Sequence, residues 1–310
     1  MRLWLLHLAV IAILIVAPAL LSPYHATNLA RIMVLAVFAM GYNLAFGYTG
    51  LLSLGHALFF AAGMYAAGLP AQIWGISAGP ALILGLLGGG AMAAAVGLLA
   101  LRTAGVSFMI VTLMFAQAGY LAILYFGATT GGDEGFTLPA TARTLAGFNL
   151  STDTPRYLTA LALYSAGLLG SLALVRLPFG RTMVAMRENE ERSRMLGYNP
   201  FTVKLVALAV SGLYAGTAGA AYAVLFGYAG ASFATIQYSI LPMLYVLLGG
   251  AGTTLGPLLG ALLMFALIEV ASGLTSAYLF FVGAALVALV LFAPKGILGT
   301  IRERWARWLP

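Results

Sequence analysis

Residues 205–294 begin LVALAVSGLYAGTAGAAYAVLFGY and run for 90 positions with a single charged side chain, Glu269. The rest of the chain is similar in character: 62% of its 310 residues are apolar and only 7% are charged. Soluble chains carry about 25% charged residues. So few charges cannot cover a soluble surface of this size, so the surface must face lipid. The sequence therefore predicts an integral membrane protein.

Four further windows lack charge altogether: 3–30, 32–101, 103–132 and 157–175, with 28, 70, 30 and 19 residues. A membrane-spanning helix needs about 20 apolar residues, and backbone amides in hydrocarbon must be hydrogen-bonded internally. The alternating ten-residue strand pattern of a membrane barrel is missing from the sequence. We therefore predict an all-α fold of about ten transmembrane helices. Their expected spans are 3–21, 28–46, 51–69, 80–101, 105–127, 157–176, 204–228, 234–249, 255–273 and 276–293.

Lys and Arg concentrate in two places, residues 176–204 and the C-terminal tail. Cytoplasmic loops of membrane proteins carry such an excess of positive charge, and ten spans then place both termini in the cytoplasm. Arg31 is the one misfit, because it falls on the outer side, where it would snorkel from the start of the second helix. The predicted organisation is a transmembrane domain at 1–294, with a cytoplasmic loop at 177–203 and an extracytoplasmic loop at 128–156, followed by a cytoplasmic tail at 295–310.

Small residues recur at four-residue spacing within the predicted spans. Such faces let membrane helices approach closely, and helix packing is the simplest explanation for each of them. The faces are Gly85-Gly89-Ala93-Gly97, Gly212-Gly216 and Gly256-Gly260.

The longest polar stretch on the cytoplasmic side runs from Pro178 to Pro200. Residues 181–196 predict one short helix, with Gly197 as its stop. Asn199 and Pro200 supply a cap and a first-turn proline for the next helix. Two i,i+4 ion pairs are expected in the short helix. They are Glu188 with Arg192 and Glu190 with Arg194.

Charges of both signs mix in this loop with flexible apolar side chains, a composition that suits docking to a protein. A solvated loop that touches anionic lipid headgroups is the alternative, and the residues alone do not decide between the two. The apolar side chains are Met183, Met186, Met195 and Leu196.

Glycines crowd two points of the chain, residues 47–63 and 249–256. They permit broken or re-entrant helices, whose free N–H groups could meet a carboxylate or carbonyl of a solute. Nearby polar side chains complete a candidate substrate path. A lone histidine between apolar helices, such as His56, usually bonds a backbone carbonyl and has a structural role. Thr112 and Gln117 could equally bond a neighbouring helix. The candidate path residues are Gly50, Ser53, Gly55, His56, Thr112, Gln117, Gly249, Gly252 and Thr253.

Four stretches, in order along the chain, carry a family resemblance. Residues 47–57, GYTGLLSLGHA, are similar to a Gly-x-x-Gly-x-Leu-Ser-Leu-Gly-His signature, and residues 248–257, LGGAGTTLGP, to a Gly-Gly-x-Gly-Thr-x-x-Gly-Pro turn. The loop contains AMRENE at 185–190 followed by LGYN at 196–199. The fourth pattern is formed by Phe108, Thr112, Leu113, Phe115 and Gln117. Together they resemble LivM-type permeases, the membrane subunits of branched-chain amino acid ABC importers.

One motif departs from the pattern of many ABC importers. Their Glu-Ala-Ala-x-x-x-Gly sequence appears here only as Glu191-Arg192-Ser193 before Gly197. The spacing from Glu to Gly is kept, so the expectation of docking to an ATPase stands.

The resemblance implies an ABC importer permease fold with cytoplasmic coupling helices, in the bacterial inner membrane. Its partners would be a second, LivH-type permease, two ATP-binding cassette ATPases that hold ATP and Mg²⁺, an extracytoplasmic solute-binding protein and membrane lipid. Asp133 and Glu134 in the outer loop would help receive the binding protein. The loop would dock into the groove of an ATPase through Arg187, Glu188, Asn189, Glu190, Glu191, Arg192, Leu196, Gly197, Tyr198 and Asn199.

The residues also exclude several functions. A phosphate-binding Gly-x-x-x-x-Gly-Lys-Ser/Thr loop is absent from the sequence, because its only lysines, Lys204 and Lys295, do not follow a glycine. ATP must then be hydrolysed by separate subunits, and no cofactor is expected on this chain. Zero cysteines and three scattered histidines predict no metal site or enzyme centre, and the basic residues form no stripe for nucleic acid.

The expected solute is small and neutral or zwitterionic, because the path has few fixed charges to hold an ion. Branched-chain amino acids are the first choice, with urea, amides or aromatic acids as alternatives. A secondary transporter that works alone would need intramembrane carboxylates or unwound carbonyl sites. Glu269 is the only such carboxylate predicted.

Overall fold

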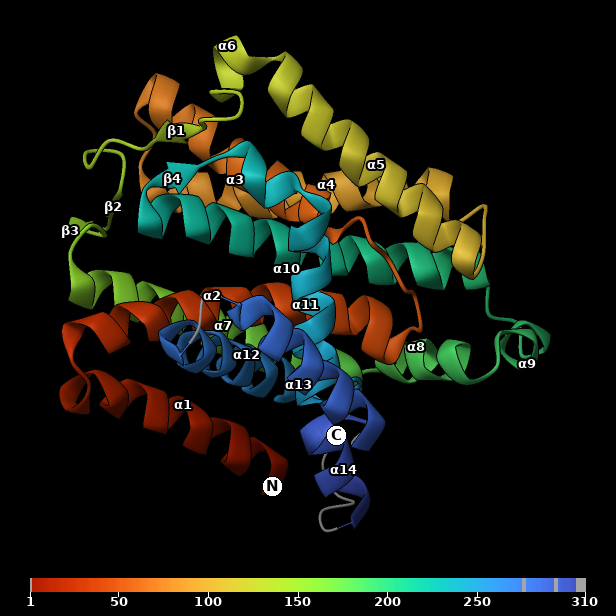
Figure 1. Ribbon diagram of the computed structural model, residues 1–310. Coiled ribbons are helices and arrows are strands. Elements are labelled where there is room, and N and C mark those ends of the chain that lie inside the picture. Colours follow the sequence, from red (N-terminus) through yellow and green to blue (C-terminus); the bar gives the residue numbers. More distant parts are fainter. Residues whose placement is uncertain (1, 275–276, 293–294, 305–310) are drawn as a thin grey trace.

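The computed structural model describes residues 2–274, 277–292 and 295–304 and shows a bundle of long helices (Figure 1). The helices of the described residues are α1 (Arg2–Leu20), α2 (Pro23–Asn43), the π-helix η1 (Leu44–Tyr48), α3 (His56–Trp74), α4 (Ala78–Ala100), α5 (Val106–Tyr125), α6 (Gly127–Thr130), α7 (Asp153–Arg176), α8 (Pro178–Glu188), α9 (Glu190–Met195), α10 (Pro200–Phe226), the 3₁₀ helix η2 (Ala231–Ala234), α11 (Ile236–Gly249), α12 (Gly256–Leu274), α13 (Tyr278–Phe292) and α14 (Gly296–Arg304). Short strands pair in two antiparallel ribbons, β1 (Phe136–Thr137) with β4 (Tyr228–Ala229) and β2 (Thr144–Leu145) with β3 (Phe148–Asn149).

Each of the ten predicted spans overlaps one of these helices, with ends that differ by up to five residues, and positions 276 and 293 of the last span lie outside the described residues. Eight helices of the described residues are long and apolar enough to cross a membrane. The other two, α11 and α13, have 14 and 15 residues, shorter than the roughly 20 residues of a full crossing. The fold is therefore that of an all-α, multi-pass membrane protein, as the composition predicted.

Helix α10 lies at the centre of the bundle, with α3 and α4 on one side and α2 and α7 on the other (Figure 1). Its contact with α4 is made by glycines: a Cβ placed on Gly216 would lie 2.7 Å from the Cα of Gly89. Gly212 abuts Ala93 and the Gly89 carbonyl, and Gly85 abuts Ala220. The small-residue faces predicted on the two helices thus form one interface, in which the backbones touch.

A second interface of this kind joins α11 to α12. A Cβ on Gly260 would collide with the carbonyl of Tyr245, and one on Gly256 would lie 2.6 Å from the carbonyl oxygen of Gly250. The predicted Gly256-Gly260 face is confirmed as a packing face.

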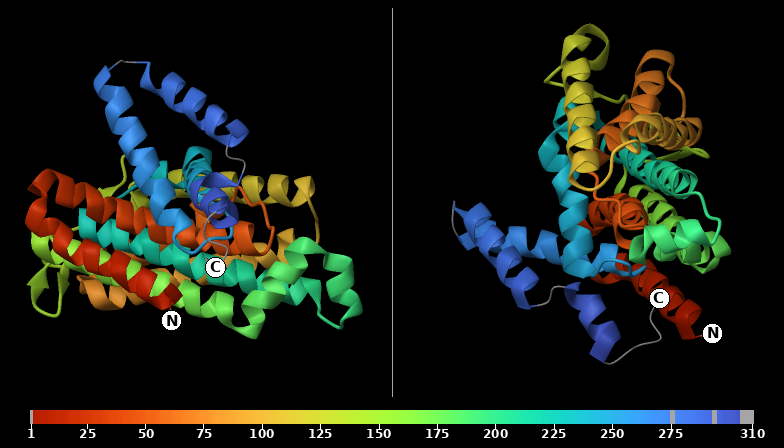
Figure 2. Two further views of the ribbon diagram at one scale, coloured as in Figure 1. Left: turned by 90° about the horizontal axis from the view of Figure 1, so that it is seen from below. Right: turned by 90° about the vertical axis from the view of Figure 1, so that its right-hand side faces the viewer.

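The two ends of the bundle carry different elements, short helices at one end and short strands at the other (Figure 1). We call them the α9 end, where α8 and α9 project, and the strand end, where β1 and β4 join the segment 128–156 to the segment 227–235. Helix α12 packs against α11 and α2, and α13 lies farther out, with α12 as its main neighbour (Figure 2). The candidate site residues fall at both ends, and the two groups are described in turn.

Candidate functional site

The projecting hairpin at the α9 end is built from two short helices. Pro178 opens α8, and Asn189 interrupts the chain in an extended conformation after Glu188. The Asn189 Oδ1 then accepts a hydrogen bond from the Arg192 amide at 2.8 Å and caps α9. The prediction of a single helix over 181–196 is therefore wrong, because a capping residue in its middle starts a new helix.

Two predicted helix boundaries after this break are confirmed, the end of α9 and the start of α10. Gly197 follows α9 with a φ of 91°, the left-handed conformation that glycine adopts without strain. Asn199 caps α10, and its Oδ1 accepts from the amides of Phe201 at 3.0 Å and Thr202 at 3.4 Å. Helix α10 accordingly begins at Pro200, earlier than the span predicted from residue 204.

Ion pairs fix the base of the hairpin. Glu190 bonds Lys204 of α10 at 2.6 Å and lies 3.7 Å from Arg194, which confirms that predicted pair. The predicted Glu188–Arg192 pair is absent among the described residues, because Asn189 breaks the helix between the two positions. Glu191 and Arg192 stay exposed.

The apolar side chains of the hairpin divide into two groups. Met183 and Met186 are buried against Leu44 and Tyr48, so they do not offer the docking contacts predicted for them. The three others are exposed and point away from the bundle. They form what we call the α9 tip: Met195 (86% exposed), Leu196 (72%) and Tyr198 (48%).

The first glycine-rich point is a broken helix. Helix α2 passes into the π-helix η1, the chain runs without helix from Thr49 to Gly55, and α3 begins at His56, later than predicted. We call residues 44–55 the first break. Two of its amides are hydrogen-bonded: the Thr112 Oγ1 accepts from the Leu54 amide at 3.2 Å, and the Ser53 Oγ accepts from the Gly55 amide at 3.1 Å. The Tyr48 hydroxyl, in contrast, is buried without a hydrogen-bond partner among the described residues.

The start of α3 is also occupied. The Ala57 amide donates to the Ser239 Oγ of α11 at 2.9 Å, so this N–H is not free for a solute in this state. His56 is fully buried, and its Nε2 lies 2.8 Å from the Ser211 Oγ of α10. Its ring packs edge-on against Tyr42 and Phe59. His56 therefore links α3 to α10 through a buried hydrogen bond.

The second glycine-rich point separates α11 from α12, and we call residues 250–255 the second break. Asn43 ties it to the first break. The Asn43 Nδ2 donates to the Thr253 carbonyl at 2.9 Å, and the Asn43 Oδ1 accepts from the Gly252 amide at 2.9 Å. Asn43 thus satisfies a donor and an acceptor of the second break with one buried side chain.

Helix α1 is fastened to the same place. The buried His7 lies 2.7 Å from the Leu3 carbonyl through Nδ1 and 2.7 Å from the Thr254 Oγ1 through Nε2. A carbonyl only accepts, so Nδ1 carries the proton and Nε2 accepts from the threonine hydroxyl.

Two arginines, one from α8 and one from α14, donate hydrogen bonds to carbonyls of the two breaks. Arg187 at the end of α8 donates to the Gly47 carbonyl, and Arg302 of α14 donates to the Gly252 carbonyl at 3.1 Å. A cavity of about 550 Å³ lies between them, lined also by Glu188 and Lys295. Arg187 thus bonds the first break while the residue itself stays exposed, and its predicted contact with an ATPase remains a prediction.

The structure brings most of the candidate path residues together at the α9 end. Gly50 lies beside the aliphatic stem of Arg187, and a Cβ on Gly252 would lie 3.2 Å from the Arg187 Nη1. Gln117 is the exception: it lies five residues beyond Thr112 along α5, half-buried, and forms no hydrogen bond among the described residues. Residues missed by the sequence prediction also shape this region. They are His7, Asn43, Ser211, Ser239 and Arg302.

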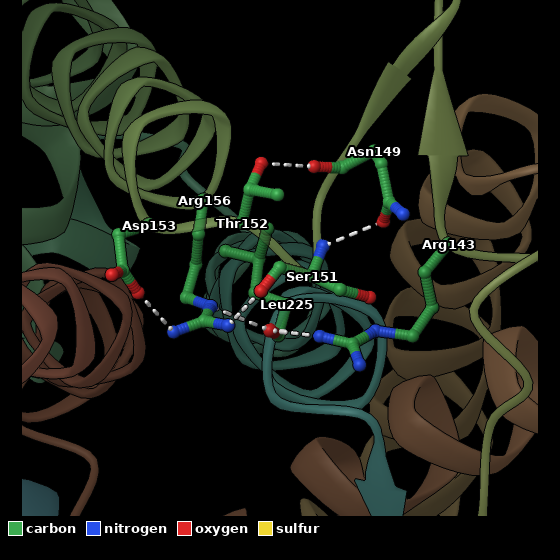
Figure 3. A network of polar contacts seen from close by, with 7 residues as sticks. All are labelled: Arg143, Asn149, Ser151, Thr152, Asp153, Arg156 and Leu225. Carbon is green, nitrogen blue, oxygen red and sulfur yellow. Dashed lines mark hydrogen bonds and ion pairs between the residues drawn. The ribbon is translucent and has the colours of Figure 1, made fainter.

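The strand end is closed by a pair of arginines over the end of α10 (Figure 3). Arg143 donates through Nε to the Val224 carbonyl at 2.7 Å and through Nη2 to the Leu225 carbonyl at 2.6 Å. Arg156 donates to Leu225 at 3.1 Å and pairs with Asp153 at 3.2 Å. Burial lowers the pKa of the Arg143 guanidinium, and the charge of Arg156 lowers that pKa further. These bonds compensate the desolvation and satisfy carbonyls that a helix C-terminus leaves open.

The acidic turn lies beside this clamp. Asp133 and Glu134 are both exposed, and the Glu134 carbonyl accepts from the Tyr228 hydroxyl at 3.0 Å. The turn is thus held to β4 by its backbone while both carboxylates remain available to a partner.

Replacing Asn43 with leucine is expected to lower the free energy of unfolding by about 2–3 kcal/mol, because it leaves the Gly252 amide and the Thr253 carbonyl buried and unbonded. Thermal unfolding of the purified protein in detergent measures the loss. The control is Gln72→Leu, which removes an exposed amide of α3 and should leave the midpoint unchanged. Equal midpoints for the two variants would contradict the structural role of Asn43.

Comparisons with known proteins point in one direction. Residues 25–293 match the family described as the branched-chain amino acid transport system permease component. The chain is 29% identical to the high-affinity branched-chain amino acid transport system permease protein LivM of Salmonella typhimurium, over 98% of this chain and 76% of that protein. It is 30% identical to LivM of Escherichia coli, over 88% of this chain and 69% of that protein.

A more distant similarity covers part of the chain. The autoinducer 2 import system permease protein LsrC of Photorhabdus laumondii is 32% identical over 44% of each protein. No solved structure matches the chain.

Proposed function

Because the chain belongs to the family of permease components of branched-chain amino acid transport systems, we propose that it forms one half of the membrane path of a binding-protein-dependent ABC importer. The solute proposed is a small zwitterion, with branched-chain amino acids first. Like the permease proteins of its family, the chain is a transporter subunit and not an enzyme. ATP and Mg²⁺ then belong to partner ATPases.

The α9 tip is the observation that supports this assignment most directly. It presents Met195, Leu196 and Tyr198 to solvent on a hairpin whose base is fixed by ion pairs. Exposed apolar side chains rimmed by charges mark a protein interface. We assign this surface to the groove of an ATPase, with Glu191 and Arg192 as its charged rim.

Movement of the hairpin has a route into the bundle. When two ATPases close on ATP, they would displace α8 and α9 as a near-rigid unit. Arg187 carries this displacement to the first break through the Gly47 carbonyl. Asn43 links the first break to the second. Both breaks would then shift together and open the path alternately to the two sides of the membrane.

The orientation follows from this assignment. The α9 end would face the cytoplasm of the inner membrane together with both termini, and the strand end would face the binding protein through Asp133 and Glu134. A second, LivH-type permease would complete the path, and two ATPases would complete the importer.

Reconstitution tests the proposal. The chain is purified with its partner permease, its ATPases and its binding protein, inserted into liposomes, and supplied with radiolabelled leucine. We expect uptake that requires both ATP inside the vesicle and binding protein outside. Uptake by the chain without ATP would contradict the importer and favour a secondary transporter.

A further inference from the structure

Arg31 is a cation with no assigned role. It is the ninth residue of α2. No other Lys or Arg of the described residues lies more than two turns inside a helix long enough to cross a membrane. Charges at such depth are costly and usually serve a function. Arg31 also falls at the strand end, against the expected charge distribution.

Among the described residues, no carboxylate or carbonyl bonds the guanidinium of Arg31. Its Nε is buried without a hydrogen bond, and the side chain forms no ion pair in the described part of the chain. The guanidinium lies over the ring of Phe226, whose centre is 5.2 Å from the Arg31 Cζ. Arg143 and Arg156, in contrast, are bonded to the carbonyls of α10 at the same end.

A second unpartnered donor lies one turn earlier. Asn28 precedes Arg31 by three residues on α2, so the two side chains share a face of the helix. The Nδ2 of Asn28 is buried and has no hydrogen bond. Two N–H donors without acceptors therefore stand side by side. Buried polar groups are normally bonded, so this pair indicates an acceptor that the chain itself does not supply.

The ring that Arg31 contacts, Phe226, belongs to a cluster of aromatic side chains. Tyr222 lies 4.8 Å from Phe226 and 4.8 Å from Phe233 between ring centres, and Phe233 lies 4.9 Å from Tyr238. Tyr222 and Tyr238 of this cluster are only partly buried. An aliphatic side chain packs against such rings, as in other small-molecule sites.

We infer that Arg31 and Asn28 form a carboxylate-binding subsite, which holds the α-carboxylate of the amino acid released by the binding protein while the aromatic rings contact its side chain. This inference rests on the proposed function. Arginine suits the role because its planar guanidinium binds a carboxylate through two hydrogen bonds. A lipid phosphate offers similar oxygen acceptors, and the test separates the two sources.

The first arm of the test measures transport by the reconstituted importer with leucine-loaded binding protein. Arg31→Gln should lower the maximal uptake rate tenfold or more, and Arg31→Lys should retain part of it. The concentration of binding protein that gives half-maximal rate should not change. Arg102→Gln, which removes an exposed arginine at the α9 end, is the control and should transport at the normal rate.

The second arm measures binding to the whole complex in nanodiscs without binding protein. Millimolar leucine should raise the unfolding midpoint of the complex, whereas leucinamide, which lacks the carboxylate, should not. Arg31→Gln should abolish the leucine shift at an unchanged starting midpoint.

The results separate the two proposals. Normal uptake and a normal leucine shift in Arg31→Gln, with ATP-driven uptake by the wild type intact, would overturn the subsite alone. A shift that follows phosphatidylglycerol content instead of leucine would assign Arg31 to lipid and also overturn it. Absence of ATP-driven uptake in the wild type would instead overturn the proposed function.

Discussion

Replacing Gly216 with leucine should prevent the bundle from forming. A Cβ at this position would lie 2.7 Å from the Gly89 Cα and 2.9 Å from the Gly89 amide nitrogen, and both are backbone atoms of α4. Backbone cannot swing aside as a flexible side chain can, so α4 and α10 would have to separate. We expect a loss of about 3 kcal/mol or more, the upper range for overpacked sites. Size-exclusion chromatography in detergent should show aggregate in place of a single peak.

A matched control isolates the effect of packing from that of the glycine itself. Gly273 is also helical, and a Cβ placed on it meets nothing within 4 Å. Gly273→Leu should therefore give a single peak and a normal unfolding midpoint. If Gly216→Leu behaved like this control, α4 and α10 could not be in backbone contact.

Replacing Leu196 with glutamate should uncouple the protein from its ATPases while leaving its fold intact. Leu196 is 72% exposed in the isolated chain, so the change removes little internal packing. In the assembled importer it would place an unpaired carboxylate in an apolar contact. Interface residues of this kind are worth about 2 kcal/mol or more, or roughly a 30-fold loss of affinity. Co-purification of the ATPases and substrate-stimulated ATP hydrolysis measure the effect.

Phe148→Glu is the control for this second variant. Phe148 is also an exposed apolar residue, at 67%, but it lies in β3 at the strand end. It should bind ATPases normally. Normal co-purification and stimulated hydrolysis in Leu196→Glu would remove the α9 tip from the coupling surface.

Helices were predictable because burial in lipid makes them follow from composition alone. Long apolar windows have one stable backbone solution, so a helix was found at each expected span, and eight of these helices are long enough to cross a membrane. The spacing of Gly85, Gly89, Gly212 and Gly216 also predicted close packing, although it could not say which helix would meet which. That pairing depends on contacts between residues more than 100 positions apart.

Local breaks were harder to predict, because one side chain can outweigh a favourable helical sequence. Asn189 sits in a run of good helix formers, yet its side chain captures the Arg192 amide and starts a new helix. Met183 and Met186 look like docking residues in sequence because periodicity does not reveal what covers a helix. In the fold, α8 lies against η1 and α10 and buries them.

The hydrogen bonds that hold the candidate site together leave a trace in the sequence. Asn43 is an amide inside a predicted span, and such a group needs a partner in lipid. Its partners in the second break lie about 210 residues away, so the partners themselves could not be derived. Arg31 stands out in the sequence because a positive charge is not expected at the outer side. In the structure its buried Nε also lacks a hydrogen bond.

Site-specific cross-linking tests most directly whether the α9 tip is held by an ATPase. The chain contains no cysteine, so Leu196→Cys and Phe148→Cys each introduce a single reactive thiol. In the complete importer in sealed vesicles with the binding-protein side outward, Leu196→Cys should cross-link to an ATPase subunit and escape a membrane-impermeant maleimide added outside. Phe148→Cys should react with that maleimide. If the thiol at 196 reacted from outside and never reached an ATPase, the hairpin could not be the part of the permease that ATP hydrolysis moves.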